Sequence, residues 1–211
     1  MIVGPQLAGG KFLDFVERLE KVMGEPVVTN RPVVALIRIH LQLTEQVRDI
    51  ALFNLAIDSE LRGCDLLSFK VSDIAQGRSI MHRAIVMQRK THRPVQFEVT
   101  DMIRQSLLAW IEQAKLSNNA FLFPSRVTRL PHLSTRQYAR IVRWCVTSIG
   151  FDFAAYGTHN MCRTKATLIY RRTKNRRAVQ LLLGHTKLGS TVRYLGIEVD
   201  DVLEISEQTE A

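Results

Sequence analysis

The sequence is poor in residues that could cross-link it. Its 211 residues include three cysteines, Cys64, Cys145 and Cys162, and no two of them have the Cys-x-x-Cys spacing of a zinc site. An odd number of widely separated cysteines also argues against a disulfide scaffold. We therefore expect reduced cysteines, and we expect neither a metal ion nor any other cofactor.

Long apolar runs are absent as well. None approaches the roughly 20 residues that a helix needs to cross a bilayer, and the first residues lack the features of a secretory signal. We expect a cytoplasmic protein with no membrane partner. The composition is globular, with 46% hydrophobic residues and only 11 glycines and 6 prolines, and the length suits one main domain.

Acidic residues are scarce in one long stretch. Between Lys115 and Arg193 there are 15 Lys and Arg residues and one acid, Asp152, whereas six acids and no base follow from Glu198 onward. Positive charge concentrated in this way attracts polyanions. It favours nucleic acid as a partner over the alternative of a basic surface that only keeps the protein in solution.

Apolar residues spaced three and four apart predict helices over most of the chain. The β-branched runs 83–88 and 94–99 flank a basic turn and predict a hairpin, to which 70–74 is a candidate third strand. N-caps at Thr100, Thr158 and Ser190 and a capping box of Ser134 with Gln137 mark four helix starts. The expected class is therefore mainly α with a small antiparallel β-sheet. The expected helices are 10–23, 33–42, 44–58, 61–69, 101–115, 134–149, 158–172, 175–183 and 190–196.

Reactive side chains gather in the last third of the chain. His159 directly follows the Thr158 N-cap, and His185 precedes Tyr194 by nine residues. In one pocket with a basic residue, they would supply a proton carrier, a cation and an oxygen nucleophile. Each is weak evidence alone, because a single His or Tyr more often packs or caps than catalyses. Their order and spacing suggest chemistry on a phosphodiester.

Five motifs in register resemble the active site of the tyrosine recombinases, the phage-integrase-like enzymes that cut and rejoin DNA. The motifs lie at 61–67, 88–91, 158–159, 183–185 and 191–194, and the resemblance runs from about Val33 to Gly196. It implies the tyrosine recombinase catalytic-domain fold. On this basis residues 33–197 form the catalytic domain, 1–32 a helical lead-in and linker, and 198–211 an acidic tail helix. The catalytic residues that the resemblance implies are Arg62, Lys90, His159, His185 and Tyr194.

The resemblance also implies a mechanism. The Tyr194 hydroxyl would attack phosphorus, form a 3′-phosphotyrosine and release a 5′-hydroxyl; the linkage conserves the energy of the phosphodiester, so neither ATP nor a metal is needed. Arg62 would neutralise charge on the non-bridging oxygens, and Lys90 would protonate the leaving oxygen. His159 would carry the proton, and His185 would donate a hydrogen bond to the phosphate.

Two features depart from the family pattern. The second catalytic arginine is expected three residues after His159, where this chain has Cys162, followed by Arg163. Because successive helical residues point about 100° apart, Arg163 is expected to be only a partial substitute, and strand transfer is expected to be impaired. The chain also has room for only one helix before Pro32, where family members usually carry a second helical domain, so its grip on DNA and its choice of site should be weaker.

Double-stranded DNA is the expected partner. One helical face carries Arg136, Arg140 and Arg143, which favours phosphate contacts over a merely solvated stripe. Val202, Leu203 and Ile205 lie among the tail carboxylates, and in the family this segment docks on a neighbouring subunit, so we expect a homo-oligomer on DNA. The residues expected to contact DNA are Arg89, Arg136, Arg140, Arg143, Lys165, Arg171, Arg172 and Lys174.

The expected function is therefore site-specific DNA recombination or integration by an enzyme of the tyrosine type. Two alternatives stay open at this point. The first is a domain of the same fold that still binds DNA but has lost catalysis. The second is a helix-turn-helix transcriptional regulator, which would leave the hairpin lysine and the ordered His, His and Tyr residues as coincidences.

Overall fold

The computed structural model describes residues 31–77, 79–126, 129–154, 158–185 and 187–195. Within these ranges the chain is mainly helical and carries two short antiparallel β-hairpins, which confirms the predicted class. The helices are α2 (Arg31–Leu43), α3 (Val47–Ser59), α4 (Gly63–Leu66), α5 (Asp101–Gln113), α6 (Thr135–Thr147), α7 (Thr158–Thr173), α8 (Arg176–Leu182) and α9 (Leu188–Leu195). The 3₁₀ turn η1 (Val71–Asp73) and the strands β1 (Ala75–Gln76), β2 (Ser79–Ile80), β3 (Arg83–Met87) and β4 (Pro94–Glu98) lie between α4 and α5.

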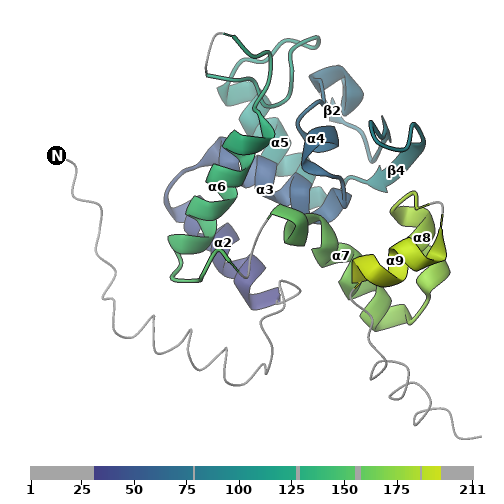
Figure 1. Cartoon of the computed structure of the whole chain (residues 1–211). Helices are drawn as coiled ribbons and strands as arrows, with labels where there is room; N and C mark the ends of the chain where they lie inside the picture. Colours follow the sequence, from purple (N-terminus) through teal and green to yellow (C-terminus); the bar gives the residue numbers. More distant parts are fainter. Residues whose placement is uncertain (1–30, 78, 127–128, 155–157, 186, 196–211) are drawn as a thin grey trace, which may run out of the picture.

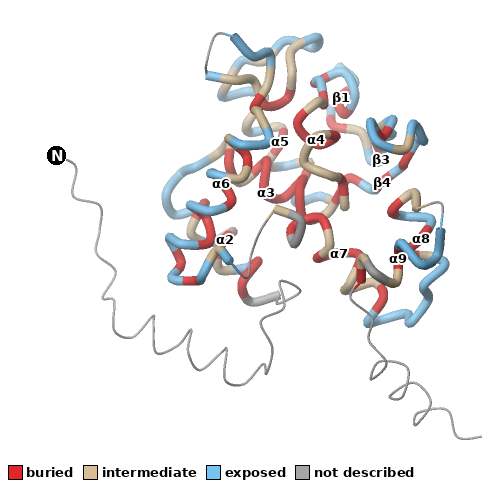
Figure 2. The backbone as a smooth tube through the Cα atoms, viewed as in Figure 1, coloured by how far each residue is buried: buried red, intermediate tan, exposed pale blue. Residues whose placement is uncertain are grey.

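Helix α3 is the centre of the larger core. Leu52, Leu55 and Ala56 are almost fully buried, as are most other residues of this helix, so it is apolar on nearly every side. Helices α2, α5 and α7 pack against it, and Figure 2 shows the buried positions on the faces that these helices turn inward. A helix surrounded in this way gives a rigid base for the residues that follow it.

A second, smaller cluster joins the last three helices. Tyr170 of α7, Val179 of α8 and Leu195 of α9 are buried together, apart from the core around α3. Figure 1 shows α8 and α9 beside α7 and below the β3–β4 hairpin. Because α7 packs on both α3 and α9, it connects the two clusters. Among the described residues, no helix is both long and apolar enough to span a bilayer.

The predicted hairpin is present. Strands β3 and β4 are antiparallel with Ala84 opposite Phe97 and Val86 opposite Val95. Ala84, Val95 and Phe97 are buried whereas Ile85 is exposed, as expected for a ribbon with one face on the core. The capping box of Ser134 with Gln137 is also present at the start of α6.

Some predicted boundaries and one predicted cap contact are wrong. The helix expected from Thr44 starts at Val47, because the Thr44 hydroxyl instead donates to the His40 carbonyl at the end of α2. Thr100 is the N-cap residue of α5, but its hydroxyl faces Asp58 at 3.5 Å rather than the α5 backbone. Helix α9 starts at Leu188, two residues before the predicted Ser190 cap.

Two further predictions are wrong about the secondary structure itself. The helix expected over 61–69 shrinks to α4, because Phe69 leaves the helix and its carbonyl accepts a hydrogen bond from Leu122 at 2.8 Å. The candidate third strand at 70–74 is mostly the turn η1, held where the Asp73 carboxylate accepts from the Lys70 N–H at 2.8 Å. The predicted helices 10–23 and 198–211 lie outside the described residues.

Candidate active site

The first candidate residue, Arg62, is positioned by a sharp turn at the end of α3. Glu60 closes that helix in the left-handed conformation, with φ of 60°, and Arg62 follows in extended conformation as the N-cap of α4. The Arg62 guanidinium lies 3.5 Å from the side-chain oxygen of Gln88. The turn thus directs Arg62 from the central core toward the β3–β4 hairpin.

Gln88 connects three parts of the site. Its side chain is buried, and its oxygen also accepts a hydrogen bond from the Thr91 hydroxyl at 2.7 Å. Its amide nitrogen donates to the Leu183 carbonyl at 3.2 Å. One amide therefore connects Arg62, the turn of the hairpin and the residue two before His185. A buried amide with all these contacts fixes their relative positions.

Asp65 supports the same hairpin. Arg62 and Asp65 are three residues apart, a spacing that allows an ordinary ion pair on a helix. The Asp65 carboxylate instead accepts from the Arg89 backbone N–H at 3.0 Å, and no ion pair joins these two described residues. Asp65 is fully buried and its second oxygen, Oδ2, has no hydrogen-bond partner. It therefore anchors the hairpin turn to α4.

Gly184 allows the hairpin and the end of α8 to meet. Its φ is +64°, and a Cβ added there would lie 2.6 Å from Cγ2 of Val95. Any other residue would be strained at this φ and would collide with the Val95 side chain. His185 follows, and its backbone is held on both sides by Gln180, whose carbonyl accepts from the His185 N–H and whose amide donates to the His185 carbonyl.

The imidazole of His185 faces α9. Its Nδ1 lies 3.1 Å from the Thr191 hydroxyl, and its ring meets the Tyr194 ring edge to face with the centroids 5.3 Å apart. Burial lowers the pKa of His185, and the positive charge of Arg62 lowers it further. A histidine in this state is neutral at physiological pH and can donate one N–H.

Tyr194 is the centre of this cluster. Its hydroxyl donates to Sγ of Cys162 at 3.1 Å, and the guanidinium of Arg163 lies 5.4 Å from its ring centroid. Burial raises the pKa of Tyr194 above its ordinary value, with further contributions from Cys162 and the Glu60 carboxylate, while Arg163 opposes them. The phenol is therefore protonated at rest and needs a base before it can attack.

Cys162 occupies the place expected for the second arginine. Its side chain is buried, and burial raises the pKa of the thiol despite the opposing effects of the Tyr194 hydrogen bond, Arg62 and Arg163. A neutral thiol gives no charge to a phosphate. Arg163, which was expected to be a partial substitute, lies against the face of the Tyr194 ring.

Lys90 and His159 are the other two predicted catalytic residues. Lys90 is exposed in the hairpin turn, and no hydrogen bond connects it to the described residues of the site. His159 belongs to the first turn of α7, but its side chain lies outside what the structure describes. The cluster that the structure brings together is Arg62, Cys162, Arg163, His185 and Tyr194.

Two residues of this site, Gln88 and Glu60, were not predicted from the sequence. Gln88 follows directly after β3, and only its place two residues before Lys90 could have drawn attention to it. Glu60 precedes the Arg62 motif, and its Oε2 is buried without a hydrogen-bond partner. Burial raises its pKa to about 7, with Lys165 lowering and Asp58 raising it. No periodicity in the sequence indicates that this carboxyl is buried.

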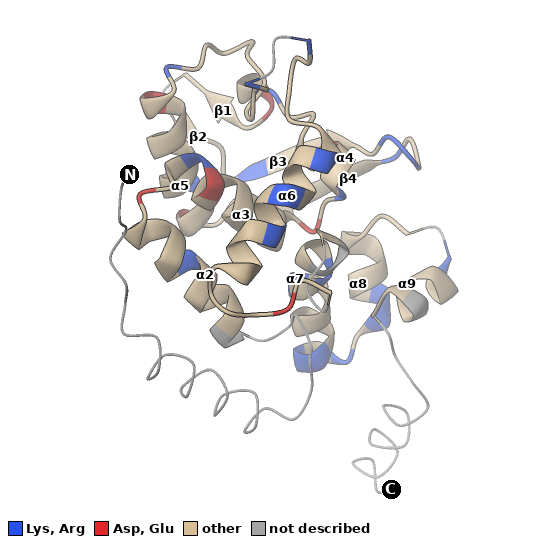
Figure 3. Ribbon diagram, turned by 60° about the vertical axis from the view of Figure 1, so that its left-hand side comes forward, with Lys and Arg blue, Asp and Glu red and all other residues tan. Residues whose placement is uncertain are grey.

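The predicted DNA-contacting residues divide into two groups. Arg136, Arg140 and Arg143 are exposed on α6. Figure 3 shows basic positions on that helix, at the hairpin turn and around α7 and α8. Arg143 also stacks over the Phe153 ring at 4.8 Å. Lys165 differs, because its ammonium donates inward to the Asp58 carbonyl at 2.9 Å. This placement argues against Lys165 as a DNA contact.

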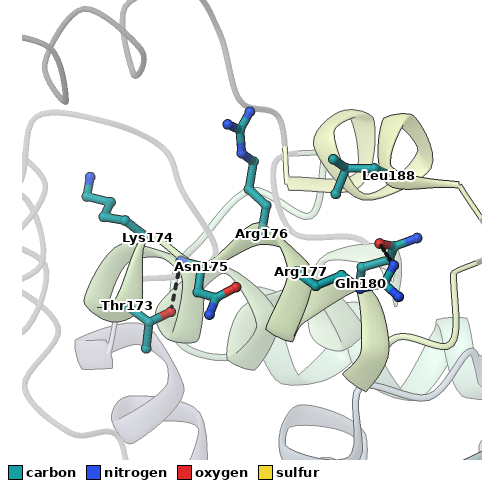
Figure 4. Close-up of a pocket in the computed structure, with 7 residues that line it drawn as sticks. All are labelled: Thr173, Lys174, Asn175, Arg176, Arg177, Gln180 and Leu188. Carbon is teal, nitrogen blue, oxygen red and sulfur yellow. Dashed lines mark hydrogen bonds between the residues drawn. The ribbon is translucent and has the colours of Figure 1, made fainter.

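The end of α7 and the start of α8 line a hollow of about 710 Å³. Lys174, Arg176 and Arg177 surround it, and Figure 4 shows the Lys174 and Arg176 side chains extended away from the helices while Arg177 bonds to Gln180. Arg171 and Arg172 are exposed on the preceding turn. The hollow is thus bordered by cations and open to solvent. Within the described ranges, no three His, Cys, Asp or Glu side chains are grouped so that they could hold a metal ion.

Residues 27–199 match the model of the phage integrase family. The chain is 30% identical over 158 residues to the probable integrase/recombinase YoeC of Bacillus subtilis (strain 168), a match that covers 75% of this chain and 82% of YoeC.

Solved structures show the same fold. The XerA recombinase superposes with a TM-score of 0.68 at 19% identity, over 85% of this chain and 63% of XerA. The XerH recombinase, bound to its palindromic difH substrate in a post-cleavage complex, gives 0.65 at 18% identity, over 84% of this chain and 51% of XerH. The chain thus spans less than two thirds of the length of these two proteins. Because the family match covers most of the chain and the fold agrees with it, this chain belongs to the phage integrase family, the tyrosine recombinases.

Proposed function

We propose that this protein breaks and rejoins DNA through Tyr194, in site-specific recombination or integration. The observation that carries the proposal is the grouping of Tyr194, His185 and Arg62 in one partly buried site, although they are contributed by α9, the end of α8 and the start of α4. Family membership supports the same reaction. It also argues against the alternative of a helix-turn-helix transcriptional regulator. A DNA substrate fits the cytoplasmic location expected from the sequence.

Each residue of the site has its own role in this reaction. The Tyr194 oxygen forms a bond to phosphorus as the bond to the 5′-oxygen breaks, which leaves a 3′-phosphotyrosine. Arg62 stabilises the charge that builds on the non-bridging oxygens, and neutral His185 donates a hydrogen bond to them. Lys90 protonates the leaving 5′-oxygen once the hairpin turn meets the DNA, and His159 assists the proton transfer.

Cys162 supports a second candidate, a DNA-binding domain without catalysis. Among the described side chains of the site, Arg62 is the one arginine placed to clamp a phosphate, since Arg163 lies against the Tyr194 ring and Cys162 is a neutral thiol. Losing one preorganised donor to a developing oxyanion costs on the order of 10²–10³ in rate. We propose a slow enzyme rather than an inactive one, because Tyr194 keeps its place beside His185.

We propose that double-stranded DNA binds across the face formed by α6 and the hairpin turn. Exposed cations that can reach phosphates lie at Arg89, Arg136, Arg140 and Arg143. Arg171, Arg172 and Lys174, around the hollow of Figure 4, extend the positive surface to the end of α7. Contacts of this kind bind duplex of any sequence and weaken with salt.

We also propose that the protein forms oligomers on DNA through its acidic tail. The tail lies outside the described residues, but its mixed acidic and apolar composition suits a surface that is itself apolar and basic. The exposed leucines Leu181 and Leu188, next to Arg176 and Lys187, offer such a surface. The occupant would be the tail of a neighbouring subunit.

Trapping the covalent intermediate tests the main proposal. The full-length protein is incubated with a pool of nicked DNA duplexes of randomised sequence, in which loss of the short strand after cleavage prevents religation. We expect a protein–DNA adduct that survives denaturation and that Tyr194→Phe abolishes while duplex affinity is unchanged. An adduct that persists in Tyr194→Phe would move the nucleophile to another residue, and no adduct with measurable DNA binding would favour the second candidate.

A further inference from the structure

The hairpin turn is held on both sides of Lys90, although the Lys90 side chain itself is exposed. On one side, the Arg89 backbone N–H donates to the buried Asp65 carboxylate at 3.0 Å. On the other, the Thr91 hydroxyl donates to the side-chain oxygen of Gln88 at 2.7 Å. Lys90 therefore extends its flexible side chain from a backbone segment that is fixed at both neighbours.

The Gln88 oxygen is shared between this turn and Arg62. The Oε1 atom that accepts from the Thr91 hydroxyl also lies 3.5 Å from Nη1 of Arg62. An amide oxygen has two lone pairs and can accept from both donors at once. Because Gln88 is only 3% exposed, water has little access to replace either contact. A movement of the hairpin turn is thus transmitted to the Arg62 guanidinium through one atom.

The orientation of the Gln88 amide is fixed by the end of α8. Its Nε2 donates to the Leu183 carbonyl at 3.2 Å. If the amide were turned over, its oxygen would face the Leu183 carbonyl and its NH₂ would face the Arg62 guanidinium, which pairs acceptor with acceptor and donor with donor. There is also little free space, since a Cβ added at Gly184 would lie 3.5 Å from Oε1 of Gln88. The amide therefore keeps its oxygen toward Arg62 and Thr91.

We propose that Gln88 is a positioning residue that brings the phosphate-binding Arg62 and the proton-donating Lys90 to the same phosphodiester. The inference rests on the proposed function, which gives these two residues their roles. Gln88 acts on Lys90 through the Thr91 hydroxyl and on Arg62 directly. A displacement of about 1 Å in a catalytic group costs on the order of 10²-fold in rate. A buried amide that sets two such groups together therefore has a large effect on cleavage without contacting the reacting atoms.

Two altered phosphodiesters separate the contribution of Lys90 from that of Arg62. Sulfur in place of the 5′-oxygen leaves as a thiolate, which needs little protonation because thiols have pKa values of roughly 8–9, so this substrate bypasses Lys90. A methyl group in place of one non-bridging oxygen removes negative charge, so this substrate depends less on Arg62. The scissile phosphodiester is located by sequencing the DNA in the trapped adduct. Each alteration is then placed there in a nicked duplex, and single-turnover rates of adduct formation are measured.

Gln88→Leu replaces the amide with an apolar side chain of similar size. It should slow adduct formation on ordinary DNA by about 10²-fold, and this factor should shrink to about tenfold on each altered phosphodiester, because each removes one of the two consequences. A defect of merely structural origin would be the same on all three substrates. A Gln88→Leu defect that stays the same on one or both altered phosphodiesters would overturn the inference.

Two matched variants make the test more specific. Thr91→Val removes only the hydroxyl, so it should slow cleavage of ordinary DNA, and its defect should shrink with the 5′-sulfur alone because Gln88 still holds Arg62. Thr91 is only partly buried, so this variant keeps the test valid if Gln88→Leu folds poorly. Gln96→Leu changes an exposed glutamine of the same hairpin and should leave all three rates unchanged. Thr91→Val cleaving as fast as the parent would overturn the inference.

A measurement without DNA tests the link itself. The protein is labelled with ¹⁵N at arginine, and the Arg62 side-chain Nε–H signal is assigned by its loss in Arg62→Lys. Thr91→Val should move this signal in the parent but not in the Gln88→Leu background, where the link is already broken. No shift in the parent, or equal shifts in both backgrounds, would overturn the inference. Failure to trap any adduct with the unaltered protein would instead refute the proposed function, and the Arg62 signal would still decide whether Gln88 joins Arg62 to the hairpin turn.

Discussion

The buried Glu60 carboxyl should make the stability of the protein depend on pH in a calculable way. Its pKa is about 7 in the fold against an ordinary 4.5. Between these two values the folded state binds more protons than the unfolded chain, so stability falls as pH rises through this window and is constant above it. The full difference corresponds to about 3 kcal/mol of lost stability at pH 8 and about 1 kcal/mol at pH 5.

Glu60→Gln removes this dependence while keeping the shape of the side chain. Urea unfolding of both proteins, followed by circular dichroism from pH 5 to pH 8, gives the difference in unfolding free energy at each pH. We expect the unfolding free energy of the variant to rise steadily relative to that of the parent, by up to about 2 kcal/mol between pH 5 and pH 8. Other titrating groups are common to both proteins and cancel in the difference. Parallel curves for the two proteins would refute the buried, unpaired state of Glu60.

Other expected outcomes follow from the site and its surface. Cys162→Arg should raise adduct formation by about 10²-fold or more, with duplex affinity nearly unchanged; a parent that already cleaves as fast would show that Arg163 acts as the second arginine. Gln88→Leu should lower the cleavage rate much more than DNA affinity, because it releases Arg62 and the hairpin turn together; equal losses in both would contradict a positioning role. Changing Arg136, Arg140 and Arg143 to Gln should reduce the log–log salt slope of DNA binding by about 0.9 per lost phosphate contact, and an unchanged slope would place the DNA elsewhere. Removing residues from Leu203 onward should weaken cooperative binding to DNA with two sites, and unchanged cooperativity would exclude the tail as the subunit contact.

The sequence predicted the fold class well because its signals are local. The 3.6-residue periodicity, the capping box at Ser134 and the β-branched runs of the hairpin each act within a few residues, and the structure has all of them. The predictions were wrong where contacts between residues far apart in the chain determine the local structure. Phe69 leaves its predicted helix to pair with Leu122, and the Asp65 carboxylate accepts from the backbone of Arg89, 24 positions along the chain.

The candidate site shows the same difference between local signals and distant contacts. Motif order identified Arg62, His185 and Tyr194, which the structure places together, but it could not show what surrounds them. The hydrogen bonds of Gln88 reach across 26 and 95 positions of the chain, to Arg62 and Leu183. The groups that act on the Glu60 carboxyl include Lys165 of α7, which follows it by about a hundred residues. Such neighbours are set by the packing of α7 on α3 and are invisible in the local pattern.

Glu60 and Cys162 are best considered together. Cys162 has no charge in its buried state, so the charged groups among the described side chains near Cys162 and Tyr194 include the Glu60 carboxylate and the guanidiniums of Arg62 and Arg163. A guanidinium at position 162 would lower the pKa of a nearby carboxyl such as that of Glu60. With the thiol there instead, desolvation is the largest effect on Glu60 and raises its pKa to about 7. The residue that weakens the phosphate clamp therefore also leaves the Glu60 carboxyl without a further opposing charge. It follows that Cys162→Arg should lower the pKa of Glu60, and a titration of ¹³C-labelled glutamate carboxyls should show a lower Glu60 midpoint in the variant than in the parent; equal midpoints would contradict this reasoning.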